Sequence, residues 1–329
     1  MSALQLETEL LEVEQLDPHG PHVVAIGGGH GLAQALVGIQ SYASRIDAVV
    51  TVADDGGSSG RLTSAFDILP PGDIRRCLLA LSPEPSLWTE MFEFRFEGSD
   101  VAGHSLGNLI LAAMSDLFGD FETAITMAEE ALACLGHVIP NSRNSLHLQA
   151  VVDGALVDGQ AAIARTRGAV SELRLLPAEA SVNPRAVEVV AAADQIVIGP
   201  GSLYTSVVSA ILVPGLAEAV NAAKADVIFV CNLTTQDGES LGMGAADHVR
   251  ALLEFAGIKT PLTALIHDGG PEFPPEAESV AHDEEQILAL GVRPVFKDLL
   301  DRTEAWPQHD PFRLGRALES LWRATQTEE

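Results

Sequence analysis

The sequence predicts an α/β fold, a Rossmann-like, doubly wound and mostly parallel sheet with a small β insertion. Short apolar runs, such as 23–26 and 194–198, stop abruptly at polar turns that contain glycine. Behind the first turn, Leu32, Leu36 and Ile39 recur at helical spacing. Strands that are apolar throughout are typical of a parallel sheet covered on both faces, and their alternation with helices predicts a doubly wound sheet.

The chain divides into a short arm and one large domain. Residues 1–20 are acidic and lack a turn pattern, so we expect a flexible N-terminal arm. Residues 21–329 are expected to form a single α/β domain with a β-rich insertion around 146–172, where Asp-Gly pairs indicate hairpins. The other expected elements are helices at 104–118 and 122–135, strands at 226–231 and 262–266, and a last helix after 309–311.

Composition limits the class of protein and its partners. The 329 residues are 47% hydrophobic and 20% charged, which is typical of a globular chain, and the formal net charge is −27. Such a surface repels nucleic-acid phosphates, so we expect no nucleic-acid partner. The three cysteines are odd in number and far apart, there is no basic signal-peptide start, and no apolar run reaches the length of a membrane span. We therefore expect a cytoplasmic protein.

The first glycine turn is Gly27-Gly28-Gly29-His30-Gly31, between an apolar run and a helical pattern. Glycine permits a tight turn and lets a ligand approach main-chain N–H groups, and the start of a helix favours a phosphate. The spacing matches neither the dinucleotide fingerprint nor the Walker pattern. Gly28, Gly29, His30 and Gly31 are therefore candidate ligand-binding residues, with a merely tight turn as the alternative.

A second polar turn, Asp54-Asp55-Gly56-Gly57-Ser58-Ser59-Gly60, follows the next apolar run. Open α/β sheets bind ligands at the carboxyl ends of their strands. Asp54 or Asp55 suits a ribose hydroxyl or a divalent cation, and Ser58 and Ser59 suit phosphate oxygens. The alternative is an Asx-turn with a helix cap and no ligand.

Two further helix starts carry unusual polar residues. Asp73, Arg75 and Arg76 open a predicted helix, where the helix dipole disfavours cations, so either an anionic ligand or a structural ion pair is expected nearby. At 103–108 the next helix begins with a second cluster. Its candidate site residues are His104, Ser105 and Asn108, and a simple cap explains only one of them.

Two later strands end in the same way. Gly201, Ser202 and Thr205 follow the apolar run at 194–198, and Asn232 follows the run at 226–231. We count all four as candidate ligand-binding residues. Five polar, glycine-bearing turns at the ends of parallel strands or the starts of helices predict a cleft.

His267-Asp268 and His309-Asp310 resemble fragments of a metal site. Neither pair supplies the ligand set of a zinc centre, so turn or capping roles are favoured and no metal site is predicted there.

Six segments carry a family resemblance: GGGHGL, VTVADDGGSSGRL, PPGDIRRCLLALS, GHSLGNLIL, IGPGSLYTS and CNLTTQDGES. They resemble, in order, the signature segments of the YvcK-like proteins, which are bacterial gluconeogenesis or morphogenesis factors and relatives of the CofD 2-phospho-L-lactate transferases. The resemblance runs from about Val23 to the final helix.

The resemblance implies a Rossmann-like fold, binding of a UDP-sugar such as UDP-N-acetylglucosamine, and a role in cell shape and peptidoglycan precursor supply on gluconeogenic carbon sources. It also suggests a homodimer. The nucleotide site it implies comprises Gly28, Gly29, His30, Asp54, Ser58, Ser59, His104, Asn108, Gly201 and Ser202. Three residues depart from the usual motif: His30 replaces Thr, Arg76 replaces Asn, and Gln308 replaces a basic residue.

Three functional hypotheses remain. The first is a regulatory protein that binds a nucleotide sugar without turnover and needs no cofactor, because the sequence shows no assignable nucleophile and base. The second is a transferase of phosphorus-containing groups, in which Asp54 and Asp55 hold Mg²⁺ across a diphosphate. The third is a hub whose acidic surface binds a protein partner that the sequence does not identify.

Overall fold

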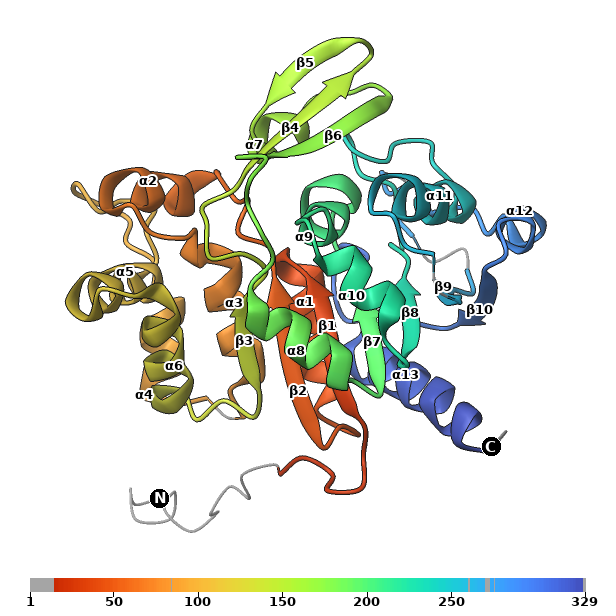
Figure 1. Cartoon of the computed structure of the whole chain (residues 1–329), viewed down its shortest axis with the longest axis horizontal. Helices are drawn as coiled ribbons and strands as arrows, with labels where there is room; N and C mark the ends of the chain where they lie inside the picture. The colour runs from red at the N-terminus through yellow and green to blue at the C-terminus, as the bar shows by residue number, and fades with distance from the viewer. Residues whose placement is uncertain (1–14, 84, 260, 270–272, 275, 328–329) are drawn as a thin grey trace.

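The computed structural model describes residues 15–83, 85–259, 261–269, 273–274 and 276–327, so most of the predicted arm lies outside the described residues. Its centre is a seven-stranded sheet in the order β10-β9-β8-β7-β1-β2-β3, and every pairing in it is parallel (Figure 1). The predicted fold class is confirmed. The strands are β1 (His22–Gly27), β2 (Arg45–Val50), β3 (His137–Pro140), β7 (Gln195–Ile198), β8 (Asp226–Val230), β9 (Leu262–His267) and β10 (Arg293–Lys297).

Helices cover both faces of this sheet. Side chains of β1 alternate between the faces, so Val23 and Ala25 join one apolar core while Val24 and Ile26 join the other. Helices α1, α3 and α13 lie on one face, and α8, η2, α10 and α11 lie on the other (Figure 1). The longer helices are α1 (Gly29–Ile39), α2 (Gly57–Phe66), α3 (Pro71–Leu81), α5 (Leu106–Phe118), α6 (Phe121–Ala131), α8 (Pro184–Ala192), α11 (Ala245–Phe255) and α13 (Pro311–Gln326). The shorter ones are α4 (Leu87–Glu93), α7 (Gln160–Ile163), the π-helix η2 (Leu203–Val208), α9 (Ser209–Ile211), α10 (Leu216–Ala222) and α12 (Glu284–Ala289).

A small antiparallel sheet interrupts the strand–helix pattern. Its order is β5-β4-β6, with β4 at His147–Val152, β5 at Ala155–Asp158 and β6 at Val170–Leu176. It stands at the end of the molecule where the strands of the main sheet terminate (Figure 1). The insertion therefore lies over the edge where α/β sheets bind ligands.

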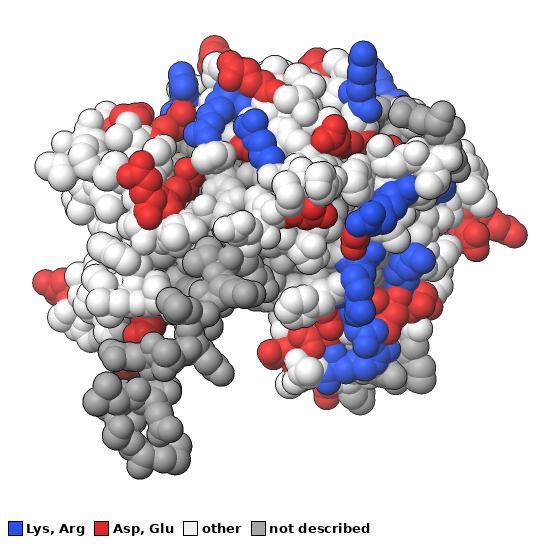
Figure 2. Space-filling model, turned by 90° about the horizontal axis from the view of Figure 1, so that it is seen from below, with Lys and Arg blue, Asp and Glu red and all other residues white. Residues whose placement is uncertain are grey.

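The surface is acidic, with its cations unevenly placed. Figure 2 shows the face at the amino ends of the strands, where Lys and Arg gather along one side among scattered Asp and Glu. In the described part of the chain no single helix is long and apolar enough to cross a membrane, whereas the bent pair Leu203–Ile211 and Leu216–Ala222 passes that test together.

A buried ion-pair network closes the amino end of β1 and β2. Asp47 is fully buried, and its Oδ2 accepts hydrogen bonds from His22 Nε2 at 2.7 Å and Arg45 Nε at 2.9 Å. Burial alone would raise the pKa of Asp47, but the bonds and charges of His22 and Arg45 outweigh it and hold the pKa below its usual range. The carboxylate is therefore ionised in the folded protein and ties two strands together.

Two glycines let α1 and α13 pack with their backbones in contact. A Cβ on Gly315 would lie 2.3 Å from Gly38 O, and a Cβ on Gly38 would lie 2.2 Å from Pro311 O. Both distances are too short for any side chain, so the position of the last helix depends on these residues.

We predict that Asp47→Asn lowers the free energy of unfolding by about 1–2 kcal/mol at neutral pH, because neutral hydrogen bonds replace charge-assisted ones. A carboxyl whose pKa is lower in the folded protein stabilises the fold fully at pH values above its unfolded pKa of about 3.9. This stabilisation is lost as the pH falls through the folded pKa. Urea titrations should therefore show a constant gap to wild type from about pH 7 to 5 that narrows below about pH 4. Asp116→Asn, at an exposed position, is the control, and a gap that widens in acid would contradict the assignment.

We predict that Gly315→Ala lowers the free energy of unfolding by about 1–2 kcal/mol. Overpacking against Gly38 destabilises the fold by about 1–3 kcal/mol. The higher helix propensity of alanine offsets this by at most about 1 kcal/mol. Gly98→Ala is the matched control, since a Cβ there meets no atom within 4 Å. Equal stability of the two variants in urea would show that α1 and α13 are not held at this distance.

Candidate functional site

The strand order places a ligand crevice between β1 and β7. Strands β2 and β3 extend the sheet on one side of this pair, and β8 to β10 extend it on the other, so the winding direction reverses there. In doubly wound sheets the ligand binds outside the carboxyl ends at such a switch point. The two predicted glycine turns meet here: a Cβ on Gly31 would lie 2.6 Å from Pro200 O, and one on Gly201 would lie 3.2 Å from Gly28 O.

A cleft runs along this edge as two cavities that share Gly29, Ser202 and Ser206. The first cavity measures about 550 Å³ and lies over the glycine turns, the segment after β8 and the segment before α13. Of the predicted site residues, it is lined by Gly28, Gly29, His30, Gly31, Gly201, Ser202 and Asn232.

The second cavity, of about 390 Å³, lies on the β2 side of the switch point. Its cations are Arg75, Arg76 and Arg95. Of the predicted site residues, it is lined by Gly29, Asp54, Ser58, Ser59, Asp73, Arg75, Asn108 and Ser202. Because the two cavities share Gly29, Ser202 and Ser206 as lining residues, they adjoin, and a ligand that extends past Ser202 and Ser206 would contact both.

Arg75 is a buried cation at the floor of the second cavity. Its Nε donates to Asn108 Oδ1 at 3.0 Å, its Nη1 donates to Phe92 O at 3.1 Å, and only 7% of the residue is exposed. Within the described residues no carboxylate lies within ion-pair distance of it. Burial and the charges of Arg76 and Arg95 outweigh the attraction of Glu93 and Asp73 and lower the pKa of Arg75 to about 10, so it remains charged at neutral pH. A buried charge is costly unless it is paired, which favours an anionic ligand here.

Ser58, His104 and Asn108 form a hydrogen-bonded chain beside Arg75. Asn108 Nδ2 donates to Ser58 Oγ at 3.0 Å, and Ser58 Oγ lies 2.9 Å from His104 Nδ1, in a hydrogen bond whose direction depends on the imidazole tautomer. Burial and the charges of Arg61 and Arg95 lower the pKa of His104, which favours the neutral imidazole. Nothing in the local sequence pairs Ser58 with His104, since 46 residues separate them.

The acidic residues of the site have separate roles. Asp54 lines the second cavity, and its Oδ1 accepts the Gly56 N–H. Asp55 points away to the insertion, where its Oδ1 accepts the Ala161 N–H at 2.8 Å. Asp73 lies against the first glycine turn, and burial together with the charge of Asp54 raises its pKa. Asp54 and Asp55 therefore do not converge on one point, and a cation between their two carboxylates does not fit this geometry.

Two other predicted residues support the site from behind. Ser105 is fully buried and caps α5 by accepting the Asn108 N–H, while the Thr205 hydroxyl bonds to the carboxylate of Glu239. Two residues that were not predicted line the cleft instead. They are Ser206, which follows Thr205 in η2, and Gln160, which belongs to the insertion. Ser206 carries the same polar signal as its neighbours, whereas nothing in the local sequence distinguishes Gln160.

Of the three residues that differ from the usual family motif, two lie together at the first cavity and the third lies in α3. His30 Nε2 is 3.0 Å from Gln308 Oε1 and 3.0 Å from Gln34 Nε2, so two of the departing residues contact each other at the cleft. Arg76, the third, is half exposed and pairs with Asp73 at 2.7 Å.

Residues of the sequence pairs His267-Asp268 and His309-Asp310 make hydrogen bonds within the fold. Asp310 caps α13 by accepting the Phe312 and Arg313 N–H groups, as expected for a capping residue. His267, Asp268 and Asp298 lie close enough to share an ion, but His267 Nδ1 already accepts the Leu299 N–H. His309 is buried beside the first cavity, and burial lowers its pKa to about 4.

Comparison with known proteins places these features in a family. Residues 23–300 match the family model described as 2-phospho-L-lactate transferase CofD. The gluconeogenesis factor of Halalkalibacterium halodurans is 42% identical over 90% of this chain and 95% of its own length. The gluconeogenesis factor of Bacillus subtilis is 39% identical over 92% of this chain and 98% of its own length.

A solved structure shares the fold. The crystal structure of a UPF0052 family member from Bacillus halodurans has a TM-score of 0.86 and 37% identity, and covers 90% of this chain and 99% of its own. The chain therefore belongs to the CofD family, within the YvcK-like gluconeogenesis factors.

Proposed function

We propose that this protein is a cytoplasmic regulator that binds a UDP-sugar of the UDP-N-acetylglucosamine type in the cleft, and that it links peptidoglycan precursor supply and cell shape to gluconeogenic growth. Arg75 carries the binding part of this proposal. It is a buried cation with no carboxylate partner among the described residues, and it lines a cavity that also holds the starts of α2 and α3. A diphosphate supplies the missing negative charge.

The shape of the cleft supports a ligand with an anionic part and a neutral polar part. The second cavity offers Arg75, Ser58 and Asn108, and the first offers glycine backbone and neutral side chains such as Ser202 and Asn232. Helices that begin at the glycine turns add the positive ends of their dipoles. A phosphate group fits the second cavity, and a base or sugar fits the first.

We predict that Arg75→Gln weakens binding of UDP-N-acetylglucosamine by about 10- to 100-fold, because a hydrogen bond to a charged group contributes about 1.5–3 kcal/mol. Calorimetric titration of wild type and variant, with melting curves to show that both are folded, measures this effect. Arg185→Gln on α8 removes the same charge outside the cleft and should leave the affinity unchanged. Absence of saturable binding to wild type, or equal affinity of Arg75→Gln, would refute the proposal.

A transferase is the second candidate, because Ser58 and His104 are at the hydrogen-bond distance expected of a nucleophile and its base. The description of the matching family names a transferase as well. Two features disfavour this reading: Asn108 also bonds to the Ser58 hydroxyl, and Asp55 does not join Asp54 in holding a cation.

We predict that binding of UDP-N-acetylglucosamine is unchanged when Mg²⁺ is replaced by excess EDTA, since only Asp54 of the proposed carboxylate pair faces the cleft. Calorimetry gives the affinity, and phosphorus NMR of the same mixture shows whether the diphosphate stays intact. Binding that requires Mg²⁺, or phosphorus signals from a product that Ser58→Ala no longer forms, would favour the transferase.

A further inference from the structure

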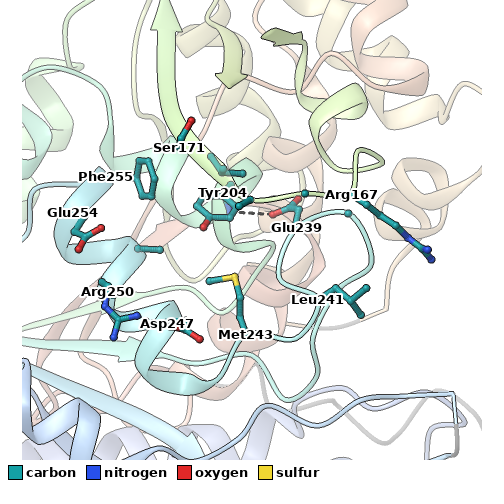
Figure 3. Close-up of a pocket in the computed structure, with 15 residues that line it drawn as sticks. Arg167, Ser171, Tyr204, Glu239, Leu241, Met243, Asp247, Arg250, Glu254 and Phe255 are labelled. Atoms are coloured by element: carbon teal, nitrogen blue, oxygen red, sulfur yellow. Dashed lines mark hydrogen bonds and ion pairs between the residues drawn. The ribbon is translucent and has the colours of Figure 1, made fainter. Parts of the chain in front are cut away.

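A third cavity lies outside the cleft, between the start of β6 and α11. It measures about 560 Å³, which is within the range of small-molecule sites, and its walls are mainly apolar. Figure 3 shows Tyr204, Phe255 and Met243 around its centre and Leu241 at its side. Glu239 lines both this cavity and the first cavity of the cleft, so the two cavities lie next to each other.

Tyr204 contributes both an aromatic ring and a hydroxyl to this cavity. It is 5% exposed, and its ring lies edge-on to Phe255 with the centroids 5.6 Å apart. Its backbone N–H donates to Glu239, whereas its hydroxyl makes no hydrogen bond to any residue that the structure describes. Burial, with the charges of Glu239, Asp247 and Glu254, raises its pKa to about 12, so the hydroxyl stays protonated. This hydroxyl is not among the fully buried polar atoms that lack a partner, so it faces the open cavity, where it can donate to an acceptor atom of a ligand.

The charges at the cavity favour a cation. Arg250 pairs with Asp247, and Arg167 pairs with Asp237, so both cations are neutralised by neighbouring carboxylates. Glu254 lies on the same helix as Arg250 and has no ion-pair partner within the described ranges (Figure 3). The unpaired charge at the rim is therefore negative, in contrast to the positive charge of Arg75 in the cleft.

We propose that this cavity is a second small-molecule site, for a ligand that combines an aromatic ring with an ammonium group. The ring packs against Tyr204 and Phe255, and the ammonium lies between the aromatic faces and Glu254, where cation–π attraction adds to charge pairing. An acceptor atom on the ligand takes the Tyr204 hydroxyl proton. A phosphorylated ligand is disfavoured, because Glu239, Asp247 and Glu254 surround the cavity.

The test uses two probes with one ring and opposite charges, tryptamine and indole-3-acetate. Ligand-observed NMR titrations of the full chain should show saturable tryptamine binding, with indole-3-acetate weaker by about tenfold or more. Phe255→Ala should weaken tryptamine by about tenfold, and Glu254→Gln, a surface change that does not threaten folding, by several-fold. Ser58→Ala in the cleft should have no effect on tryptamine.

Two outcomes would overturn the proposal. One is equal or tighter binding of indole-3-acetate to wild type. The other is tryptamine binding that Phe255→Ala and Glu254→Gln leave unchanged, which would place the probe elsewhere on an acidic surface. Glu188→Gln, which removes one negative charge from α8, is the matched control and should change neither affinity.

Discussion

Contact between the glycine turns after β1 and β7 is the constraint on which the site depends. These strands are neighbours in space although about 170 residues separate them, and their turns approach so closely that a Cβ on Gly31 would overlap Pro200 O. A side chain at this point would push the turns apart and break the floor of the cleft. The same contact joins the halves of the fold, because β1 pairs with β2 on one side and with β7 on the other.

Around this floor the protein combines an extreme negative charge with a local positive site. The net charge of −27 repels anions at a distance, but screening limits that field to roughly 10 Å in salt. Inside the cleft, Arg75 is held by Asn108 and the Phe92 carbonyl, groups that orient the guanidinium without neutralising it. The neighbouring cavity under Tyr204 has the opposite polarity. The local arrangement of side chains, rather than the net charge, therefore sets the polarity of each cavity.

Much of this arrangement could be predicted from the sequence, because strand ends and glycine turns are encoded locally. The fold class followed from apolar runs that stop at polar turns, and the parallel topology then brought those turns to one edge. Side-chain direction was not predictable. Thr205 and Ser206 are adjacent hydroxyls, and the wide turn of η2 directs Ser206 to the cleft and Thr205 to Glu239. The partner of Asp55 lies 106 residues away, beyond the reach of any local pattern.

The contact between His30 and Gln308 shows why single departures from a motif are better interpreted in pairs. Taken separately, each substitution removes a group that the family motif is expected to supply at the cleft. In the folded chain the two side chains meet at 3.0 Å, and Gln34 approaches the same imidazole nitrogen at the same distance. One nitrogen cannot donate to the Gln308 oxygen and accept from the Gln34 amide at once, so the imidazole has two alternative arrangements. All three side chains line the first cavity, so the tautomer of His30 decides which glutamine it bonds to there.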